Sequence, residues 1–188
     1  MSSLHGIKID ESSIVNRQEV ERELEYLMKE ASRLGFPESL AVRAYPKLER
    51  IRELSYRPVL LHGDFTPEHV FLDERAVSVT DFERLRLGNE AWDLARFISY
   101  FDMMLVQLNV SRFSHLLKSE FLQATGRAPE WDRDELVNGF SLMIMLSKWV
   151  DAMRKLESRR TPSSYVFLPF LAGKALRNIR CLCENRPV

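Results

Sequence analysis

The sequence predicts an α+β fold that is mainly helical, with a small β-hairpin inserted between two helical parts. Three observations support this prediction. Apolar residues recur at helical spacing before residue 58 and after residue 90, short runs of strand-forming residues fill the stretch between, and polar residues gather where those runs end. The 188 residues include 45% hydrophobic side chains, enough for one core. A single domain over residues 1–188 is therefore expected.

Two helices are predicted before residue 58. The first covers Asn16–Leu34, where apolar residues recur at helical spacing, and Gly35 is a stop signal. A second helical pattern runs over Leu40–Leu54 and contains Pro46. An interior proline loses one backbone hydrogen bond and clashes with the preceding turn. We therefore expect the second helix to break near Pro46.

Three short strands are predicted next. Pro58–Leu61 and His69–Leu72 are apolar runs rich in strand formers, and Ala76–Thr80 alternates between apolar and polar residues. Asp73–Arg75 is a polar reversal between the last two runs. These two runs are therefore expected to pair as a hairpin.

Helical periodicity returns after residue 90. The expected helices are Ala91–Leu108, Phe113–Thr125, Asp132–Leu156 and Phe167–Glu184. Trp149 has the spacing of a core residue, although together with Asp151 it is also compatible with lining a small-molecule pocket.

Charge and composition exclude several classes of function. The 27 basic and 27 acidic residues cancel, so no broad positive field exists to bind nucleic acid or anionic lipid. The most apolar run, Gly139–Leu146, is much shorter than a membrane helix, and Met1–Asp10 lacks the pattern of a signal peptide. Cys181 and Cys183 diverge around a helix, so reduced thiols are expected. We expect a soluble cytoplasmic protein without nucleic-acid or membrane partners.

Polar residues collect where the predicted strands end. The first strand ends in His62, Gly63 and Asp64, the second opens with His69, and the third ends in Asp81. If the last two strands pair, His69 and Asp81 become neighbours, and Asp64 on its loop can face them. Two carboxylates and an imidazole at one place need a positive charge nearby. A divalent metal that carries phosphates would supply this charge.

Three sequence blocks in this region resemble one known family. They are His62–Asp73, Val79–Glu83 and Gly88–Ala95. Their order and spacing resemble the catalytic segment of aminoglycoside phosphotransferase and choline kinase-like enzymes, which are small-molecule relatives of the protein kinases. The resemblance is close over Pro58–Phe97 and general elsewhere. It implies a protein kinase-like C-terminal lobe, with a catalytic segment at 58–97 and a helical substrate-side region at 98–188.

The resemblance implies a role for each polar residue. Asp64 matches the catalytic aspartate that orients the substrate hydroxyl, and Asp81 matches an aspartate that binds Mg²⁺ on the nucleotide phosphates. His62 and Asp93 match residues that support the catalytic loop. His69 stands where most members have an asparagine ligand of a second Mg²⁺, and imidazole is a poorer ligand for this ion. A histidine here resembles the macrolide phosphotransferase-type branch.

The N-terminal β lobe of the family has no visible counterpart in the sequence. Only 61 residues precede His62, they have a helical pattern, and the seven glycines include no Gly-x-Gly loop. We therefore expect the nucleotide-covering lobe to be absent from this chain.

Three functions remain compatible with the sequence. The leading hypothesis is an ATP- or GTP-dependent phosphotransferase that uses Mg²⁺ and acts on a hydroxyl of a small molecule. The alternative is a non-catalytic or split large lobe that lacks the N-terminal lobe or needs a partner chain. The third is a metal-dependent hydrolase with four side-chain ligands, namely His62, Asp64, His69 and Asp81.

The sequence leaves the identity of the acceptor open. Several acidic residues could attract a cationic amino sugar or choline, but they could equally be helix starts and solvated faces. They are Glu130, Asp132, Asp134 and Asp151.

Overall fold

The computed structural model describes residues 17–53, 58–107, 120, 123, 135–158 and 167–184. Five long helices are defined in these ranges. They are α1 (Arg17–Arg33), α2 (Glu38–Glu53), α3 (Ala91–Gln107), α5 (Glu135–Glu157) and α6 (Phe167–Glu184). Between α2 and α3 the chain forms short strands and two 3₁₀ turns. They are β1 (Val59–Leu61), η2 (Pro67–His69), β2 (Val70–Leu72), β3 (Val77–Val79), η3 (Phe82–Arg84) and β4 (Arg86–Gly88).

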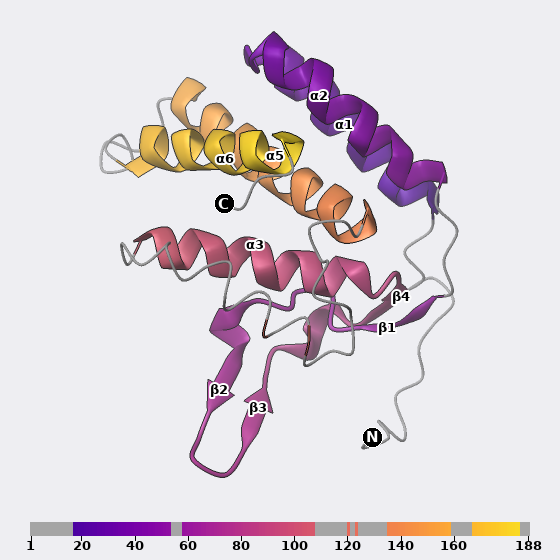
Figure 1. The fold of residues 1–188 in the computed structure, drawn as a ribbon, viewed down its shortest axis with the longest axis vertical. Helices are drawn as coiled ribbons and strands as arrows, with labels where there is room; N and C mark the ends of the chain where they lie inside the picture. Colours follow the sequence, from indigo (N-terminus) through magenta and orange to yellow (C-terminus); the bar gives the residue numbers. More distant parts are fainter. Residues whose placement is uncertain are drawn as a thin grey trace.

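Helix α5 is the centre of the core. It contacts α1, α2, α3 and α6, and in Figure 1 it lies with α6 between the α1–α2 pair and α3. The run Gly139–Leu146 is buried all around the helix, as expected for a helix surrounded by others. Gly139 allows the closest approach, because a methyl group there would lie 2.6 Å from Cγ1 of Ile51 on α2. The most apolar run of the sequence is thus the centre of the core.

The expected break at Pro46 is wrong, because α2 continues from Glu38 to Glu53. The carbonyl that loses its donor belongs to Val42, whose residue is 69% exposed, so water can donate in its place. Both halves of the helix also carry buried residues that hold them in the core. These are Leu40, Ala44, Leu48 and Ile51. Their burial outweighs a cost of about 3 kcal/mol for an interior proline.

The predicted hairpin is confirmed, and a fourth strand is added to the three expected ones. β2 pairs antiparallel with β3, with Phe71 opposite Ser78. β1 forms a separate two-stranded sheet with β4, in which Leu60 lies opposite Leu87. The hairpin projects away from the helices in Figure 1. Sequence patterning missed β4 because its three residues include an arginine and a glycine and show no alternation.

The later helices largely agree with the predicted bounds. α3 and α6 match the expected helices, while the expected helix Phe113–Thr125 lies outside the described residues except at 120 and 123. Trp149 is 2% exposed and packs edge-on against Phe36, so it belongs to the core. Cys181 and Cys183 are free thiols. Among the described helices, none combines the length and apolar character needed to cross a membrane.

Candidate active site

The loop that follows β1 is fixed by the first turn of α3. Asp93 accepts a hydrogen bond from the His62 N–H at 2.7 Å through Oδ2 and one from the Gly63 N–H at 3.0 Å through Oδ1. Burial raises the pKa of Asp93, and the two backbone donors partly offset this effect. The loop backbone is therefore held by a side chain that lies 30 residues further along the chain.

Gly63 allows this loop to pack directly against the backbone of η3. Its φ is +80°, and a Cβ at this position would lie 2.0 Å from the carbonyl oxygen of Arg84. Both the left-handed conformation and the close approach require glycine. The glycine therefore sets the position of the next residue, Asp64.

His62 joins the same loop to the end of β3. Its Nε2 lies 2.8 Å from the Thr80 carbonyl oxygen, and its Nδ1 accepts a hydrogen bond from the Asp64 N–H at 3.4 Å. Because a carbonyl oxygen only accepts, Nε2 carries the proton. A ring with this single proton satisfies both nitrogens. His62 therefore tethers Asp64 to the residue before Asp81, and neither nitrogen is free to bind a metal.

Two arginines surround the Asp64 carboxylate. The Arg96 Nε donates to Oδ1 at 2.6 Å, and a second guanidinium nitrogen of Arg96 contacts the same oxygen. Arg84 Nε lies 3.7 Å from Oδ2, beyond hydrogen-bond distance. Oδ2 is therefore the oxygen with the looser partner, and it can accept a hydrogen bond from a ligand hydroxyl.

His69 and Asp81 form the second half of the site. His69 Nε2 lies 3.3 Å from Oδ2 of Asp81, and His69 Nδ1 lies 2.9 Å from the carbonyl oxygen of Asp64. The carbonyl requires the proton on Nδ1, so in a singly protonated ring the lone pair of Nε2 faces the Asp81 carboxylate. An imidazole nitrogen and a carboxylate oxygen this close are compatible with a shared metal cation.

The backbone at Asp81 supports this picture. Asp81 has φ +64° and ψ +59° and is the only non-glycine residue with positive φ among the described residues. For an L-amino acid this left-handed conformation costs about 1–2 kcal/mol. Strained residues of this kind concentrate at functional sites.

The structure brings together only part of the expected cluster. The side chains of His69 and Asp81 meet, but Asp64 reaches His69 through its backbone carbonyl while its carboxylate contacts Arg96. No three His, Cys, Asp or Glu side chains gather as a metal site in the part of the chain that is described. The four-ligand hydrolase site is therefore not formed there. The Asp81 carboxylate is the ligand type that Mg²⁺ takes beside phosphates and water, whereas the His69 imidazole is a poorer ligand for this ion.

Comparison with known proteins identifies the family. Residues 3–136 match the sequence model of APH, the phosphotransferase enzyme family. The chain belongs to this family. The matched range contains the loop, the hairpin and α3 in full. No curated protein sequence matches the chain.

Two solved structures share the fold of this phosphotransferase-family chain. The first is the GDP complex of wild-type aminoglycoside 2'-phosphotransferase-IIIa, with a TM-score of 0.57, 15% identity, and coverage of 92% of this chain and 53% of that one. The second is a thermostable mutant of the aminoglycoside phosphotransferase APH(4)-Ia in apo form, with a TM-score of 0.51, 13% identity, and coverage of 86% and 52%. This chain thus spans about half the length of each. The family and the kinase-like fold are confirmed, whereas the macrolide branch stays a prediction.

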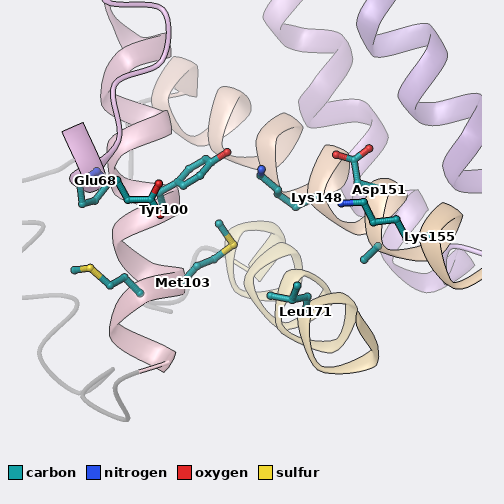
Figure 2. Close-up of a pocket in the computed structure, with 10 residues that line it drawn as sticks. Glu68, Tyr100, Met103, Lys148, Asp151, Lys155 and Leu171 are labelled. Carbon is teal, nitrogen blue, oxygen red and sulfur yellow. The ribbon is translucent and has the colours of Figure 1, made fainter. Parts of the chain in front are cut away.

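Two cavities lie near the loop that follows β1 in this phosphotransferase-family chain. One, of about 310 Å³, lies among η2, α3, α5 and α6, and Figure 2 shows Lys148 extending from α5 toward Tyr100 on α3. The other, of about 300 Å³, reaches Gly63 and Arg96. Tyr100 and Lys148 line both. The cavities therefore adjoin each other at Tyr100 and Lys148.

The sequence analysis missed the basic residues of this site. Arg96 follows Asp93 by three positions and precedes Tyr100 by four, which places all three on one face of a helix. Arg96 is the one basic residue of α3, and this is the signal that could have revealed it. The interpretation that Trp149 and Asp151 line a small-molecule pocket holds for Asp151, which lines the first cavity, but not for Trp149.

Proposed function

We propose that this chain is the catalytic lobe of a phosphotransferase that moves the γ-phosphoryl group of ATP or GTP to a hydroxyl of a small molecule. One observation carries the proposal. Asp64, on a loop fixed by Asp93, lies beside the His69–Asp81 pair, in which two acceptors face each other across 3.3 Å. Membership of the phosphotransferase family supports the same reaction type. We keep a cytoplasmic location within the proposal, since both cysteines are free thiols.

Each group has a defined part in the proposed reaction. The Asp64 carboxylate orients the acceptor hydroxyl and takes its proton as the hydroxyl oxygen attacks the γ-phosphorus. The bond from this phosphorus to the bridging oxygen breaks, and the nucleoside diphosphate leaves. Asp81 and His69 would hold Mg²⁺, which supplies charge neutralisation for the phosphates when bound.

The choice between ATP and GTP stays open within the proposal. One solved relative by fold is a GDP complex, which supports a guanine nucleotide as one option for this chain. Both nucleotides carry the same triphosphate, so the roles of Asp64 and Asp81 are the same for either.

A second candidate function rests on the surface of the hairpin. Phe71, Leu72 and Val77 are 57%, 78% and 67% exposed. Exposed apolar patches of this kind mark interaction surfaces. The hairpin therefore favours a large lobe that is completed by another lobe or a partner chain, and that transfers phosphate only when completed.

Nucleotide binding tests both candidates. Titration calorimetry of the full chain with Mg²⁺·ATP and Mg²⁺·GTP is expected to show binding of at least one, and Asp81→Asn should weaken it about tenfold, since a direct metal ligand is lost. Asp64→Asn should keep nucleotide binding and abolish transfer. Asp73→Asn in the exposed hairpin turn is the matched control and should change neither.

The two candidates differ in turnover. Release of nucleoside diphosphate that depends on an added hydroxyl compound supports the first candidate. Nucleotide binding without transfer supports the second. The absence of nucleotide binding in the presence of Mg²⁺ rejects the first candidate for the chain by itself.

A further inference from the structure

The cavity beside the loop that follows β1 is lined by four cationic side chains, each from a different element, namely η3, β4, α3 and α5. Arg84, Arg86, Arg96 and Lys148 contribute four positive charges, and Glu23 of α1 contributes the one carboxylate among the described lining residues. The cavity of about 300 Å³ also reaches Gly63, the residue before Asp64. A potential ligand of Asp64 in this cavity therefore meets a strongly positive surface.

Arg96 is paired with Asp64, but part of the remaining positive charge is not neutralised within the described chain. Arg86 stacks on Trp92 with its guanidinium carbon 4.8 Å from the ring centroid, and its buried Nε has no hydrogen-bond partner among the described residues. Burial lowers the pKa of Arg86, and the carboxylates of Glu23, Asp93 and Glu19 only partly offset this effect. A buried donor without a partner is costly, which makes an anion in the cavity favourable.

Lys148 and Arg84 are also available to a ligand. Lys148 Nζ lies 4.7 Å from the centroid of the Tyr100 ring, and no carboxylate of the described residues pairs with it. Arg84 is 67% exposed in its side chain, and its ion pair with Asp64 is 3.7 Å long. Long, exposed ion pairs contribute little, so Arg84 can turn to a ligand at small cost.

The adjoining cavity of about 310 Å³ shows no excess of positive charge among its lining residues. Its charged lining residues are two acids and two bases, namely Glu68, Asp151, Lys148 and Lys155. The other acidic residues that could attract a cationic acceptor, Glu130, Asp132 and Asp134, lie outside the described residues. The excess of one sign is thus specific to the cavity that reaches the catalytic loop.

We propose that the acceptor of this chain is a small hydroxylated anion, a carboxylate or a phosphate ester, whose charge is bound by Arg84, Arg86 and Lys148 while its hydroxyl reaches Asp64. This inference rests on the proposed phosphotransferase function. The cavity volume is at the lower end for small-molecule sites, which fits a molecule about the size of a monosaccharide. A polycation such as an aminoglycoside would be repelled by the four cations.

A panel of four related sugars tests the inference by titration calorimetry on the full chain with Mg²⁺ and nucleotide present. Gluconate and glucose 6-phosphate carry the two anionic groups, glucose is neutral, and glucosamine is cationic. At least one anionic sugar is expected to bind about tenfold more tightly than glucose, and glucosamine more weakly than glucose, as charge-assisted hydrogen bonds predict. If gluconate binds more tightly, the anionic group of the acceptor is a carboxylate; if glucose 6-phosphate binds more tightly, it is a phosphate ester.

Matched variants assign the preference to this cavity. Lys148→Gln should reduce the anionic preference about tenfold and leave glucose binding within twofold. Lys155→Gln, two turns further along α5 and outside this cavity, should leave the preference unchanged. Glucosamine binding as tightly as the anions, equal effects of the two variants, or no binding of either anion overturns the inference.

Phosphoryl transfer to the same panel separates this inference from the function on which it rests. Transfer to glucosamine in preference to the anions overturns the inference and supports the phosphotransferase. Tight binding of an anion at Lys148 without transfer supports the charge assignment and counts against the reaction.

Discussion

The close contact between Gly63 and the backbone of Arg84 gives the sharpest test of the site geometry. Gly63→Ala places a methyl group 2.0 Å from the Arg84 carbonyl oxygen, at a residue with φ +80°. Gly35 has nearly the same backbone angle, φ +78°, but a methyl group there would meet nothing within 4 Å. The two substitutions therefore share the backbone strain and differ in the steric overlap.

The magnitudes follow from this difference. An L-residue in the left-handed region costs about 1–2 kcal/mol, and the reduced entropy of the unfolded chain returns about 0.4–1 kcal/mol. Gly35→Ala is therefore expected to destabilise the fold by about 1 kcal/mol. Gly63→Ala adds about 1–3 kcal/mol for the overlap, since the Gly63 backbone cannot move without disturbing the hydrogen bonds to Asp93. Its total cost should be about 2–4 kcal/mol.

Urea unfolding of the full chain, followed by circular dichroism, measures both free energies of unfolding. A third variant, Gly173→Ala, lies within α6, has no positive φ and meets nothing within 4 Å, so it should stabilise the fold by about 0.5–1 kcal/mol. The expected order of stability is Gly173→Ala, wild type, Gly35→Ala, Gly63→Ala. Equal costs at positions 35 and 63 would refute the close packing of the loop on η3.

Three further predictions concern the site and its support. Arg96→Gln should lower the free energy of unfolding in urea by about 1.5–3 kcal/mol, because Arg96 and Asp64 hydrogen-bond to each other. The same substitution should cost much less in an Asp64→Asn background, and additive costs would contradict this. Gly139→Ala should cost about 1–3 kcal/mol through its clash with α2, and an unchanged midpoint would contradict it. Burial raises the pKa of Asp93 above its ordinary value of 3.8, so the folded chain binds this proton more tightly than the unfolded chain. The stabilisation that results is lost as pH rises through the raised pKa. Asp93→Asn should therefore flatten the fall of the melting temperature above pH 4, and an unchanged slope would contradict this.

The helices and the hairpin could be predicted because their signals are local. The bounds of α6 and the pairing of Val70–Leu72 with Val77–Val79 follow from periodicity and a polar turn. The uninterrupted α2 could not be predicted, because the stability of its residues around Pro46 comes from burial against α5. β4 was missed for a similar reason, since it pairs with β1, which lies on the other side of the β2–β3 hairpin in the sequence. Contacts between distant parts of the chain therefore determine both the continuous α2 and the strand β4.

The site residues were located by the sequence, but the directions of their side chains were not. Asp64, His69 and Asp81 lie where the strands end, yet the Asp64 carboxylate accepts a hydrogen bond from Arg96, which lies 32 residues further along the chain. Only the backbone carbonyl of Asp64 reaches His69, and this contact fixes the proton on Nδ1 and directs the Nε2 lone pair to Asp81. In the proposed reaction two tasks are separate, since arginine supplies positive charge at Asp64 while a cation would supply it at His69 and Asp81. Such a division is what transfer between a metal-bound nucleotide and a second substrate requires.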